Sequence, residues 1–501
     1  MPIPRSSGVL LHPTSLPGRF GLGDLGAEAF AFVDFLAAAG QSWWQILPLG
    51  PTGYGHSPYS AYSAFAGNPL LINLERLVER AELEPDDIAG IAMAEGVAHF
   101  DAVQPFKERL LHKAARTFAA EASPRRREAF EDFCFEQAHW LNDHAIFQSL
   151  RNQFGNRPWN RWPEGIRCRE QSALHRWGTE LAETIHAHKY IQFVFFEQWD
   201  ILKDYANRKG IGLIGDIPIF VAFDSADVWA NTRLFHLDDA GTPTVVAGVP
   251  PDYFSKTGQR WGNPLYRWER MAEDGFAWWL ARFRANLALT DLVRIDHFRG
   301  FEACWAIPAE EPTAVKGRWT PVPGTALFEA LRRELGLELP LIAEDLGIIT
   351  PEVEALRDGF ALPGMKILQF AFGGDADNPY LPHNLTRDCV VYTGTHDNNT
   401  TLGWWKTLAK MERDRVREYL GHGGREMPWD LIRLAQASVA RLCILPMQDL
   451  LGLGADGRMN VPGQASGNWG WRYRPGDLKP EIAERLARLV ALYGRDRRSS
   501  S

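Results

Sequence analysis

The sequence has no long hydrophobic run, and it contains few cysteines. No apolar stretch approaches the roughly 18 residues that cross a bilayer, and the N-terminus MPIPRSSGVLLHPTS has no signal-peptide core. The five cysteines are odd in number, far apart and in no CxxC pair, which argues against a disulfide framework or a zinc knuckle. We therefore expect a cytoplasmic protein with reduced thiols and no membrane partner.

An excess of positive charge is also missing. The net charge is -8, and acidic and basic residues are mixed along the chain, so no extended cationic surface is expected and nucleic acid is not a predicted partner. The HExxH, Walker and GxSxG motifs are absent. Two G-x-G-x-x-G matches, at 21–26 and 452–457, each lack one of the flanking elements that a dinucleotide site needs. We expect neither a metal nor a cofactor.

Aromatic residues and glycine, by contrast, are plentiful. Trp, Tyr and Phe make up 12% of the 501 residues, and many of them lie in Gly/Pro-rich segments rather than in periodic ones. Sugars present flat C–H faces to aromatic rings, while their hydroxyls need fixed donors and acceptors, so aromatic loops with Asp, Asn, Gln and His suit a carbohydrate. The alternative for most of the 19 Trp is simple core filling.

Short apolar, β-branched runs predict eight strands with helical patterns between many of them. The predicted strands cover residues 42–49, 68–74, 212–220, 291–296, 339–345, 365–372, 389–394 and 441–447. Predicted helices include AEAFAFVDFLAAAG, closed by Gly40, TALFEALRRELG, closed by Gly336, and TPEVEALRDG, with Thr350 as N-cap. This alternation predicts an α/β protein with a (β/α)8 TIM barrel, and a doubly wound open sheet is the alternative.

Two segments interrupt the alternation. Residues 75–205 have helical periodicity and no good strand, so we interpret them as a mainly helical insertion subdomain. Residues 1–74 and 206–501 would then form the catalytic barrel. The stretch of about 221–280 is rich in Gly, Pro, Asp and Trp and is too long for an ordinary barrel loop, so we expect substrate loops over the C-terminal face of the barrel.

Carboxylates follow several of the predicted strands at their C-terminal ends, which converge in a barrel. They are Asp216, Asp296, Glu344 with Asp345, Asp397 and Asp449. Carboxylates gathered over an apolar core repel one another, so their arrangement costs stability and indicates catalysis. Taken singly, each of them could instead be a helix cap or an ion-pair partner.

Arg294 and Asp296 are two residues apart, so on a strand they point to the same face. We expect the cation to lower the pKa of Asp296 and keep it ionised as a nucleophile. Glu344, beside an ionised Asp296 and behind the apolar LPLIA, should have a raised pKa and serve as a general acid. One charged and one protonated carboxyl is the pairing of glycosidases. His396 and Asp397 are adjacent, and spacing does not predict that both reach a substrate.

Several motifs together resemble the amylomaltases, the 4-α-glucanotransferases of glycoside hydrolase family 77. The motifs are GDIPIFVAFDSADVWA, PPDYFSKTGQRWGNPLYRW, RIDHFRGF, IAEDLG, THDNNTT and NVPGQASGNWGWRY, and the resemblance runs essentially from end to end. It implies that Asp296 is the nucleophile, Glu344 the general acid/base and Asp397 a third carboxylate that binds sugar hydroxyls. The implied substrate-binding residues are Ser57, Tyr59, Asp216, Asp252, Phe254, Gln259, Trp261, Arg294, His396 and Asn468.

The resemblance further implies a retaining transfer of 4-α-glucan segments between maltooligosaccharides and other α-1,4-glucans, such as amylose or starch- or glycogen-derived chains, with glucose or maltose as acceptors. In a retaining enzyme the carboxyls of Asp296 and Glu344 should lie roughly 5 to 6 Å apart. An α-amylase-like hydrolase would use the same three carboxylates, and a non-enzymatic glucan-binding protein would need only the aromatic cleft.

Overall fold

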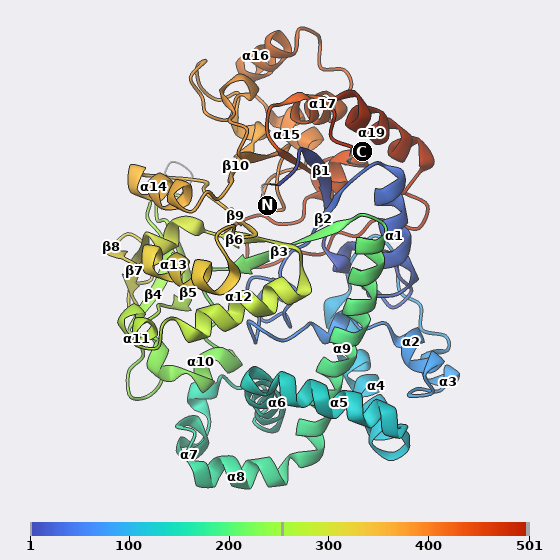
Figure 1. Ribbon diagram of the computed structural model, residues 1–501, viewed down its shortest axis with the longest axis vertical. Helices are drawn as coiled ribbons and strands as arrows, with labels where there is room; N and C mark the ends of the chain where they lie inside the picture. Colours follow the sequence, from blue (N-terminus) through green and yellow to red (C-terminus); the bar gives the residue numbers. More distant parts are fainter. Residues whose placement is uncertain (1–2, 252–254, 497–501) are drawn as a thin grey trace.

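Eight parallel strands form the centre of the computed structural model, which describes residues 3–251 and 255–496 (Figure 1). In sheet order they are β10 (Gly364–Ile367), β11 (Cys389–Tyr392), β12 (Leu442–Pro446), β1 (Ser6–Leu10), β2 (Trp43–Gln45), β3 (Gly212–Pro218), β6 (Leu292–Asp296) and β9 (Leu341–Ala343). The edge strands β9 and β10 lie next to each other, and the backbone N–H of Ala343 donates to the carbonyl of Pro363 (2.9 Å). The sheet thus closes into the predicted (β/α)8 barrel.

Seven of the eight strand predictions are confirmed, and one is wrong. The run at 68–74 forms a 3-10 turn (Pro69–Leu71) and enters helix α2 (Leu74–Glu79). The side chains of Asn68 and Asn73 accept hydrogen bonds from the backbone N–H groups of Leu70 and Arg76, which starts helical turns at both places. The missing strand is β1, whose sequence SSGVL has only two apolar residues and gave no signal.

The barrel interior changes from apolar to charged along its axis. Ile214 of β3 lies opposite Leu292 of β6, and both belong to the buried apolar cluster inside the barrel. Two residues further along the same strands, Asp216 lies opposite Arg294, and both side chains are buried. Side chains two residues apart share a face of the strand. Strand β6 therefore directs an apolar side chain into the barrel at its N-terminal end and charged side chains at its C-terminal end.

Helices surround the strands. The predicted helices are confirmed as α1 (Ala27–Ala38), α13 (Gly324–Leu335) and α14 (Pro351–Gly359). The other helices outside the segment between β2 and β3 are α10 (Ala226–Ala230), α11 (Trp268–Glu273), α12 (Ala277–Leu289), α15 (Thr401–Thr407), α16 (Lys410–Leu420), α17 (Trp429–Ala437), α18 (Met447–Leu450) and α19 (Pro480–Leu492). Gly336 ends α13 with φ +97°, a backbone angle that favours glycine.

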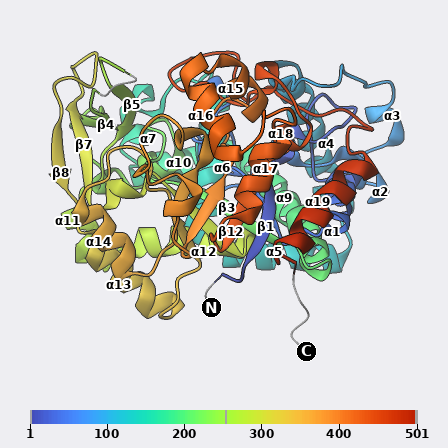
Figure 2. The same cartoon turned by 90° about the horizontal axis from the view of Figure 1, so that it is seen from above.

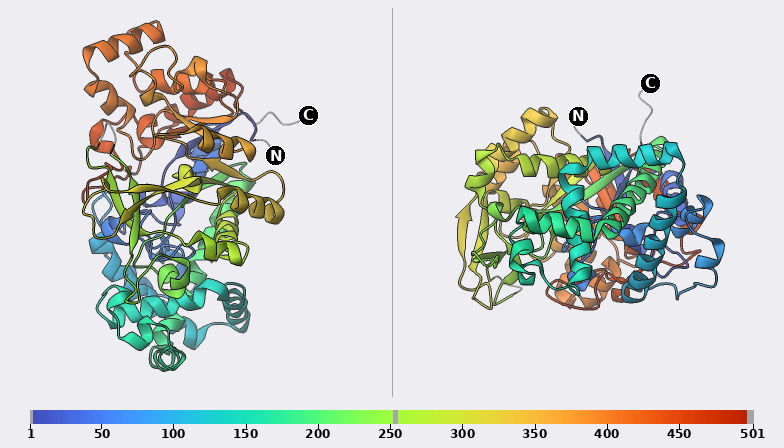
Figure 3. Two further views of the ribbon diagram at one scale, coloured as in Figure 1. Left: turned by 90° about the vertical axis from the view of Figure 1, so that its left-hand side faces the viewer. Right: turned by 90° about the horizontal axis from the view of Figure 1, so that it is seen from below.

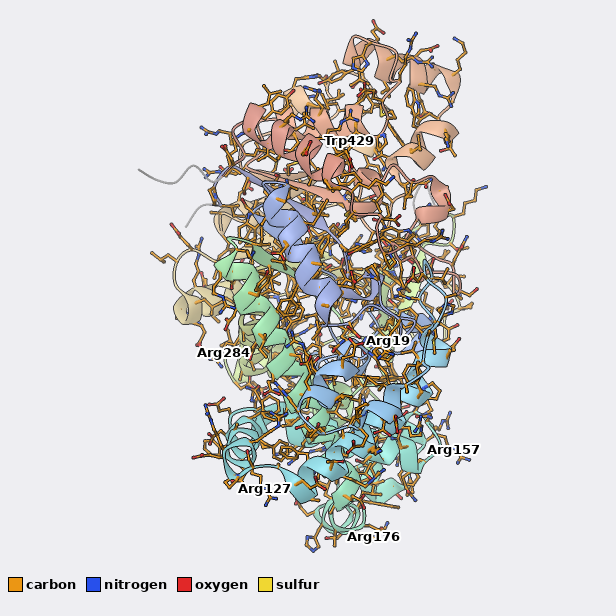
Figure 4. The ribbon with its side chains drawn as sticks, turned by 90° about the vertical axis from the view of Figure 1, so that its right-hand side faces the viewer. Arg19, Arg127, Arg157, Arg176, Arg284 and Trp429 are labelled. Carbon is orange, nitrogen blue, oxygen red and sulfur yellow. The ribbon has the colours of Figure 1, made fainter. Side chains whose placement is uncertain are left out.

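The chain between β2 and β3 is helical, as expected for residues 75–205. It contains α2, α3 (Pro85–Ile88), α4 (Phe100–Glu121), α5 (Pro124–Glu136), α6 (Ala138–Gln153), α7 (Glu164–Arg167), α8 (Gln171–Glu180) and α9 (Ala182–Arg208). Helices α5 to α8 lie at one end of the molecule, and α15 to α17 lie at the other (Figures 1 and 3). In Figure 4, Arg127 and Arg176 mark the first end and Trp429 the second.

Helix α9 connects this helical segment to the barrel. Its C-terminal part packs on α1 and β3, and α1 and α9 run side by side in Figure 4. Its side chains Phe195, Trp199 and Leu202 are buried in the same core cluster as Phe32 and Leu36 of α1. The subdomain boundaries given above remain a prediction.

A second, antiparallel sheet stands beside the barrel and was not expected. Its order is β5 (Gln259–Pro264), β4 (Val245–Val249), β7 (Ala303–Pro308) and β8 (Arg318–Pro321). It lies on the same side of the molecule as α11, α13 and α14 (Figure 2). Gly248 and Gly262 interrupt its short strands, which is why the alternation of polar and apolar residues gave no signal there. Strands β4 and β5, at the two ends of the predicted loop 247–261, pair antiparallel and form the β4–β5 hairpin.

All five cysteines are free thiols, and Cys304, Cys389 and Cys443 are buried. Burial raises the pKa of the Cys389 and Cys443 thiols to about 11, so both are protonated at neutral pH. Within the described ranges, no helix combines the length and the apolar character needed to cross a membrane.

Candidate active site

The predicted catalytic residues meet at the C-terminal ends of three neighbouring strands. Asp216 lies in β3, Arg294 and Asp296 lie in β6, and Glu344 follows β9 directly. The register pairs Ile295 with Ala343, and the backbone N–H of Glu344 donates to the carbonyl of Ile295 (3.0 Å). Glu344 therefore continues the sheet beside Asp296, on the same face as that residue. The separation of roughly 5 to 6 Å between the two carboxyls remains a prediction.

Arg294 is the centre of a buried ionic network. Its Nη1 donates to both carboxylate oxygens of Asp216 (2.7 and 2.8 Å), and its Nη2 lies 3.0 Å from Oδ1 of Asp296. The Tyr59 hydroxyl donates to Oδ2 of Asp216 (2.7 Å). Asp216 thus accepts hydrogen bonds from both Arg294 and Tyr59. The same guanidinium is also the cation next to Asp296. The Asp296 side chain remains 29% exposed, so it can meet a ligand.

Glu344 is held by two backbone N–H groups. His297 donates to Oε2 (2.6 Å) and Leu346 donates to Oε1 (3.0 Å). His297 has left-handed backbone angles (φ +52°), an uncommon conformation outside glycine, at the turn that carries its N–H to Glu344. The turn after the nucleophile candidate thus fixes the orientation of the acid candidate.

The two carboxyls have unequal proton affinities. Burial raises the pKa of Glu344 to about 8; Arg294 opposes this rise, and the charge of Asp296 adds to it. Burial also raises the pKa of Asp296 to about 6, against the attraction of Arg294. The expectation of a lowered Asp296 pKa is wrong, because Arg294 shares its charge with Asp216 and burial is the larger effect. The predicted order is confirmed: at neutral pH, Asp296 is ionised and Glu344 protonated.

Asp397 and His396 both reach this site although they are adjacent in sequence. Strand β11 ends at Tyr392, so the two residues lie in a loop where side chains do not alternate between faces. Asp397 Oδ1 accepts from the Asn460 side chain (2.6 Å) and lies 3.4 Å from Nε2 of His396. The His396 ring stacks on Tyr59, with 5.1 Å between centroids.

The predicted glucan contacts differ in their surroundings. Trp261 of β5 is 39% exposed, and its ring meets the His297 ring edge-on at 4.8 Å. Its Nε1 donates to the Gln259 side chain (3.1 Å). The hairpin therefore presents both residues beside His297, whose backbone N–H binds Glu344. Asp252 and Phe254 lie outside the described residues, as does Tyr253.

Ser57 and Asn468 make local hydrogen bonds. The Ser57 hydroxyl accepts from the backbone N–H of Tyr59 (3.2 Å). Asn468 accepts from the Val461 N–H (2.9 Å) and donates to the Gln464 carbonyl (2.9 Å), which closes the loop between those residues. Their roles as glucan contacts remain predictions.

Two of the gathered carboxylates do not belong to the site. Asp345 accepts from the Met365 N–H (2.6 Å) and pairs with Arg357 of α14, on the side of β9 away from Glu344. Asp449 accepts from the Thr393 hydroxyl (2.6 Å) and from the N–H and hydroxyl of Thr401 (both 2.7 Å), at the start of α15. These two carboxylates therefore have the alternative roles considered above: Asp345 is an ion-pair partner, and Asp449 accepts hydrogen bonds at the start of a helix.

Sequence reasoning missed Asn460 and Trp469, which complete the Asp397 side of the site. The Trp469 ring lies 5.9 Å from that of Tyr59 and 6.0 Å from that of His396. Both residues lie within the NVPGQASGNWGWRY motif, which indicated the family but carried no periodic pattern that placed them. In the described part of the chain, no group of three His, Cys, Asp or Glu is arranged to hold a metal ion.

Known proteins share both the sequence and the fold. The 4-alpha-glucanotransferase model of glycoside hydrolase family 77 matches residues 11–479. The 4-alpha-glucanotransferase of Thermus thermophilus is 53% identical over 98% of this chain and 99% of its own, and that of Synechocystis is 51% identical over 98% of both. The structure of an amylomaltase from Streptococcus agalactiae in complex with acarbose has a TM-score of 0.94 and 40% identity, covering 98% of this chain and 100% of that one. This chain belongs to the 4-alpha-glucanotransferase family, glycoside hydrolase family 77.

Proposed function

We propose that this chain transfers 4-α-glucan segments between α-1,4-linked glucans by a retaining double displacement on Asp296 and Glu344. The observation that carries the proposal is a pair of neighbouring carboxyls in unlike surroundings: half-buried Asp296 lies beside Arg294, and buried Glu344, whose pKa is the higher, accepts two backbone N–H groups. A retaining mechanism needs a nucleophile and an acid/base with this difference in proton affinity. Membership of the family supports the glucan substrates.

The first displacement forms a glycosyl-enzyme. Asp296 Oδ attacks the anomeric carbon of the donor while Glu344 gives its proton to the glycosidic oxygen, so the C–O bond breaks and the reducing-end fragment leaves as an alcohol. In the second step Glu344, now a carboxylate, takes the proton from the 4-hydroxyl of an acceptor, whose oxygen displaces Asp296. Two inversions retain the configuration, and the number of glycosidic bonds is unchanged.

The remaining residues bind and orient. In this proposal Arg294 keeps Asp296 ionised and directed at the anomeric carbon, and Asp397, which accepts a hydrogen bond from Asn460, also accepts hydrogen bonds from sugar hydroxyls. Tyr59 and His396, whose rings stack on each other, line the sugar site that we propose. Glucose and maltose are the acceptors that we propose.

Incubation with maltotriose tests the function. A transferase produces free glucose and longer chains with no gain in total reducing ends, because each bond broken is replaced by a new one. A hydrolase of the α-amylase type would raise the total of reducing ends. A non-enzymatic glucan-binding protein would leave maltotriose unchanged, and either result would refute the proposal.

The pH dependence of kcat/KM should be bell-shaped, with a maximum near neutrality. Activity requires ionised Asp296 and protonated Glu344, so it falls as the pH drops through about 6 and as it rises through about 8. Initial rates of glucose release from maltotriose across this range check the profile. In Glu344→Gln the residual activity should lose only the alkaline limb; a profile with the same two limbs would contradict the assignment.

The β4–β5 hairpin should protect the glycosyl-enzyme from water. Water is present at roughly 55 M, so an acceptor wins only by being positioned. Replacing residues 251–257 by two glycines, or Trp261 by Ala, should raise the ratio of hydrolysis to transfer by on the order of tenfold. Total reducing ends and glucose are measured in parallel. Deleting Gly423 from the exposed stretch 421–423 is the control, and an unchanged ratio in the hairpin variants would exclude the role.

We further propose that the protein is cytoplasmic, which the free state of its five cysteines supports. Cell fractionation with an antibody against the chain tests this location. Recovery in an extracytoplasmic fraction would contradict it.

A further inference from the structure

Arg299 is a buried cation three residues after Asp296, and the reaction described above does not use it. It lies in the 3-10 turn Phe298–Phe301, directly after the Asp296 strand, and is 6% exposed. Its Nη1 donates to the backbone carbonyl of Ile348 (2.8 Å), and its guanidinium carbon lies 3.6 Å from the centroid of the Trp319 ring. Arg294 binds carboxylates, whereas Arg299 binds a carbonyl and an aromatic face.

The carbonyl that Arg299 binds belongs to the loop that holds Glu344. Leu346 donates to Oε1 of Glu344, and Ile348 follows two residues later, with Gly347 at φ +91° between them. The other oxygen of Glu344 is held by His297, which is the N-cap of the turn that carries Arg299. Arg299 therefore ties together the two segments that supply both hydrogen-bond donors of the acid/base.

Trp319, which lies outside the barrel, supports the Arg299 guanidinium. It lies on β8, directly opposite Trp305 on β7, and the two rings meet edge-on at 5.2 Å. The Trp305 Nε1 donates to the Ala314 carbonyl (2.9 Å), which fixes that ring in turn. The stacked guanidinium is thus held on the small antiparallel sheet, which Figure 2 shows next to α13 and α14.

We propose that Arg299, seated on Trp319, is a positioning residue that keeps the 345–350 loop in place and thereby aims the Glu344 carboxyl at the glycosidic oxygen. The inference rests on the proposed role of Glu344 as acid/base. A proton is transferred efficiently only within hydrogen-bond reach, and a displacement of about 1 Å can cost on the order of 100-fold in rate. Loss of the contact between Arg299 and the Ile348 carbonyl should slow a reaction step that needs a proton from Glu344. It should leave the rate of a step without that need nearly unchanged.

Two donors separate these steps. Maltotriose needs protonation of its departing oxygen, whereas α-maltotriosyl fluoride loses fluoride with little help from an acid. For Arg299→Met we expect kcat/KM to fall roughly 10- to 100-fold with maltotriose and less than about threefold for fluoride release. Arg299→Lys can reach the carbonyl without the planar stacking, so it should recover part of the loss. Trp319→Leu should show a smaller loss with the same selectivity.

Arg332 of α13 provides a matched control. It also donates to one backbone carbonyl, that of Gly359 (3.0 Å), and its guanidinium carbon lies 4.4 Å from the centroid of the Phe360 ring. Its contacts connect α13 with the end of α14. Arg332→Met should therefore lower kcat/KM only slightly, and by the same factor with maltotriose and with α-maltotriosyl fluoride.

Glu344→Gln distinguishes the inference from the function on which it rests. If Glu344→Gln loses maltotriose activity but keeps fluoride release while the Arg299 and Trp319 variants lose both equally or neither, the inference alone is overturned. If Glu344→Gln itself shows no selective loss, the proposed mechanism fails. Should Arg299→Met not fold, Arg299→Lys and Trp319→Leu decide by the same ratio.

Discussion

Replacing Asp296 by Asn should lower kcat/KM for maltotriose disproportionation by roughly 10⁴- to 10⁶-fold, the range that loss of a nucleophile produces in other enzymes. The amide has nearly the same shape and can still accept a hydrogen bond from Arg294, but it is a poor nucleophile, so no glycosyl-enzyme forms. Chain redistribution followed by chromatography measures the loss, with a discontinuous assay long enough to detect the residual rate.

Asp345→Asn is the control for this experiment. Asp345 is buried and adjoins Glu344 in sequence, but it faces Arg357 and the backbone of Met365. Its replacement should lower the melting temperature while leaving the activity of the folded protein much less affected. Comparable losses in Asp296→Asn and Asp345→Asn would mean that Asp296 acts through stability and is not the nucleophile.

Replacing Arg294 by Met should reduce both stability and activity, because buried Asp216 and half-buried Asp296 lose their shared cation. Removing one partner of a buried ion pair costs about 3–5 kcal/mol of unfolding free energy. The pKa of Asp296 should rise further above about 6 without the attraction of Arg294, so the acid limb of the kcat/KM profile should move to higher pH. Urea unfolding and pH profiles measure the two effects separately.

The double variant Arg294→Met with Asp216→Asn separates the two roles of Arg294. Removing the charge of Asp216, which takes both hydrogen bonds of Nη1, should restore part of the unfolding free energy. It should not restore activity, because Asp296 still lacks its cation. Recovery of activity together with stability would show that Arg294 only supports the fold.

The barrel was largely predictable because its strands are continuous apolar runs, and the pairing of Arg294 with Asp296 followed from strand alternation alone. Prediction failed where that alternation gives no signal. Strand β1 is short and half polar, and the small sheet is broken by Gly248 and Gly262. Asp345 was grouped with the site because it follows a strand, although alternation sends it to the face opposite Glu344.

The sequence by itself indicated the family, the two carboxyls that we propose as the catalytic pair, and the order of their proton affinities. Only the tertiary structure decided the values of those affinities, because burial and the sharing of Arg294 between Asp216 and Asp296 depend on three strands brought together. It also decided that Asn460 and Trp469 join Asp397 and His396 from more than 60 residues away in the chain. Local spacing fixes the face on which a side chain lies, and only packing between distant segments fixes its neighbours.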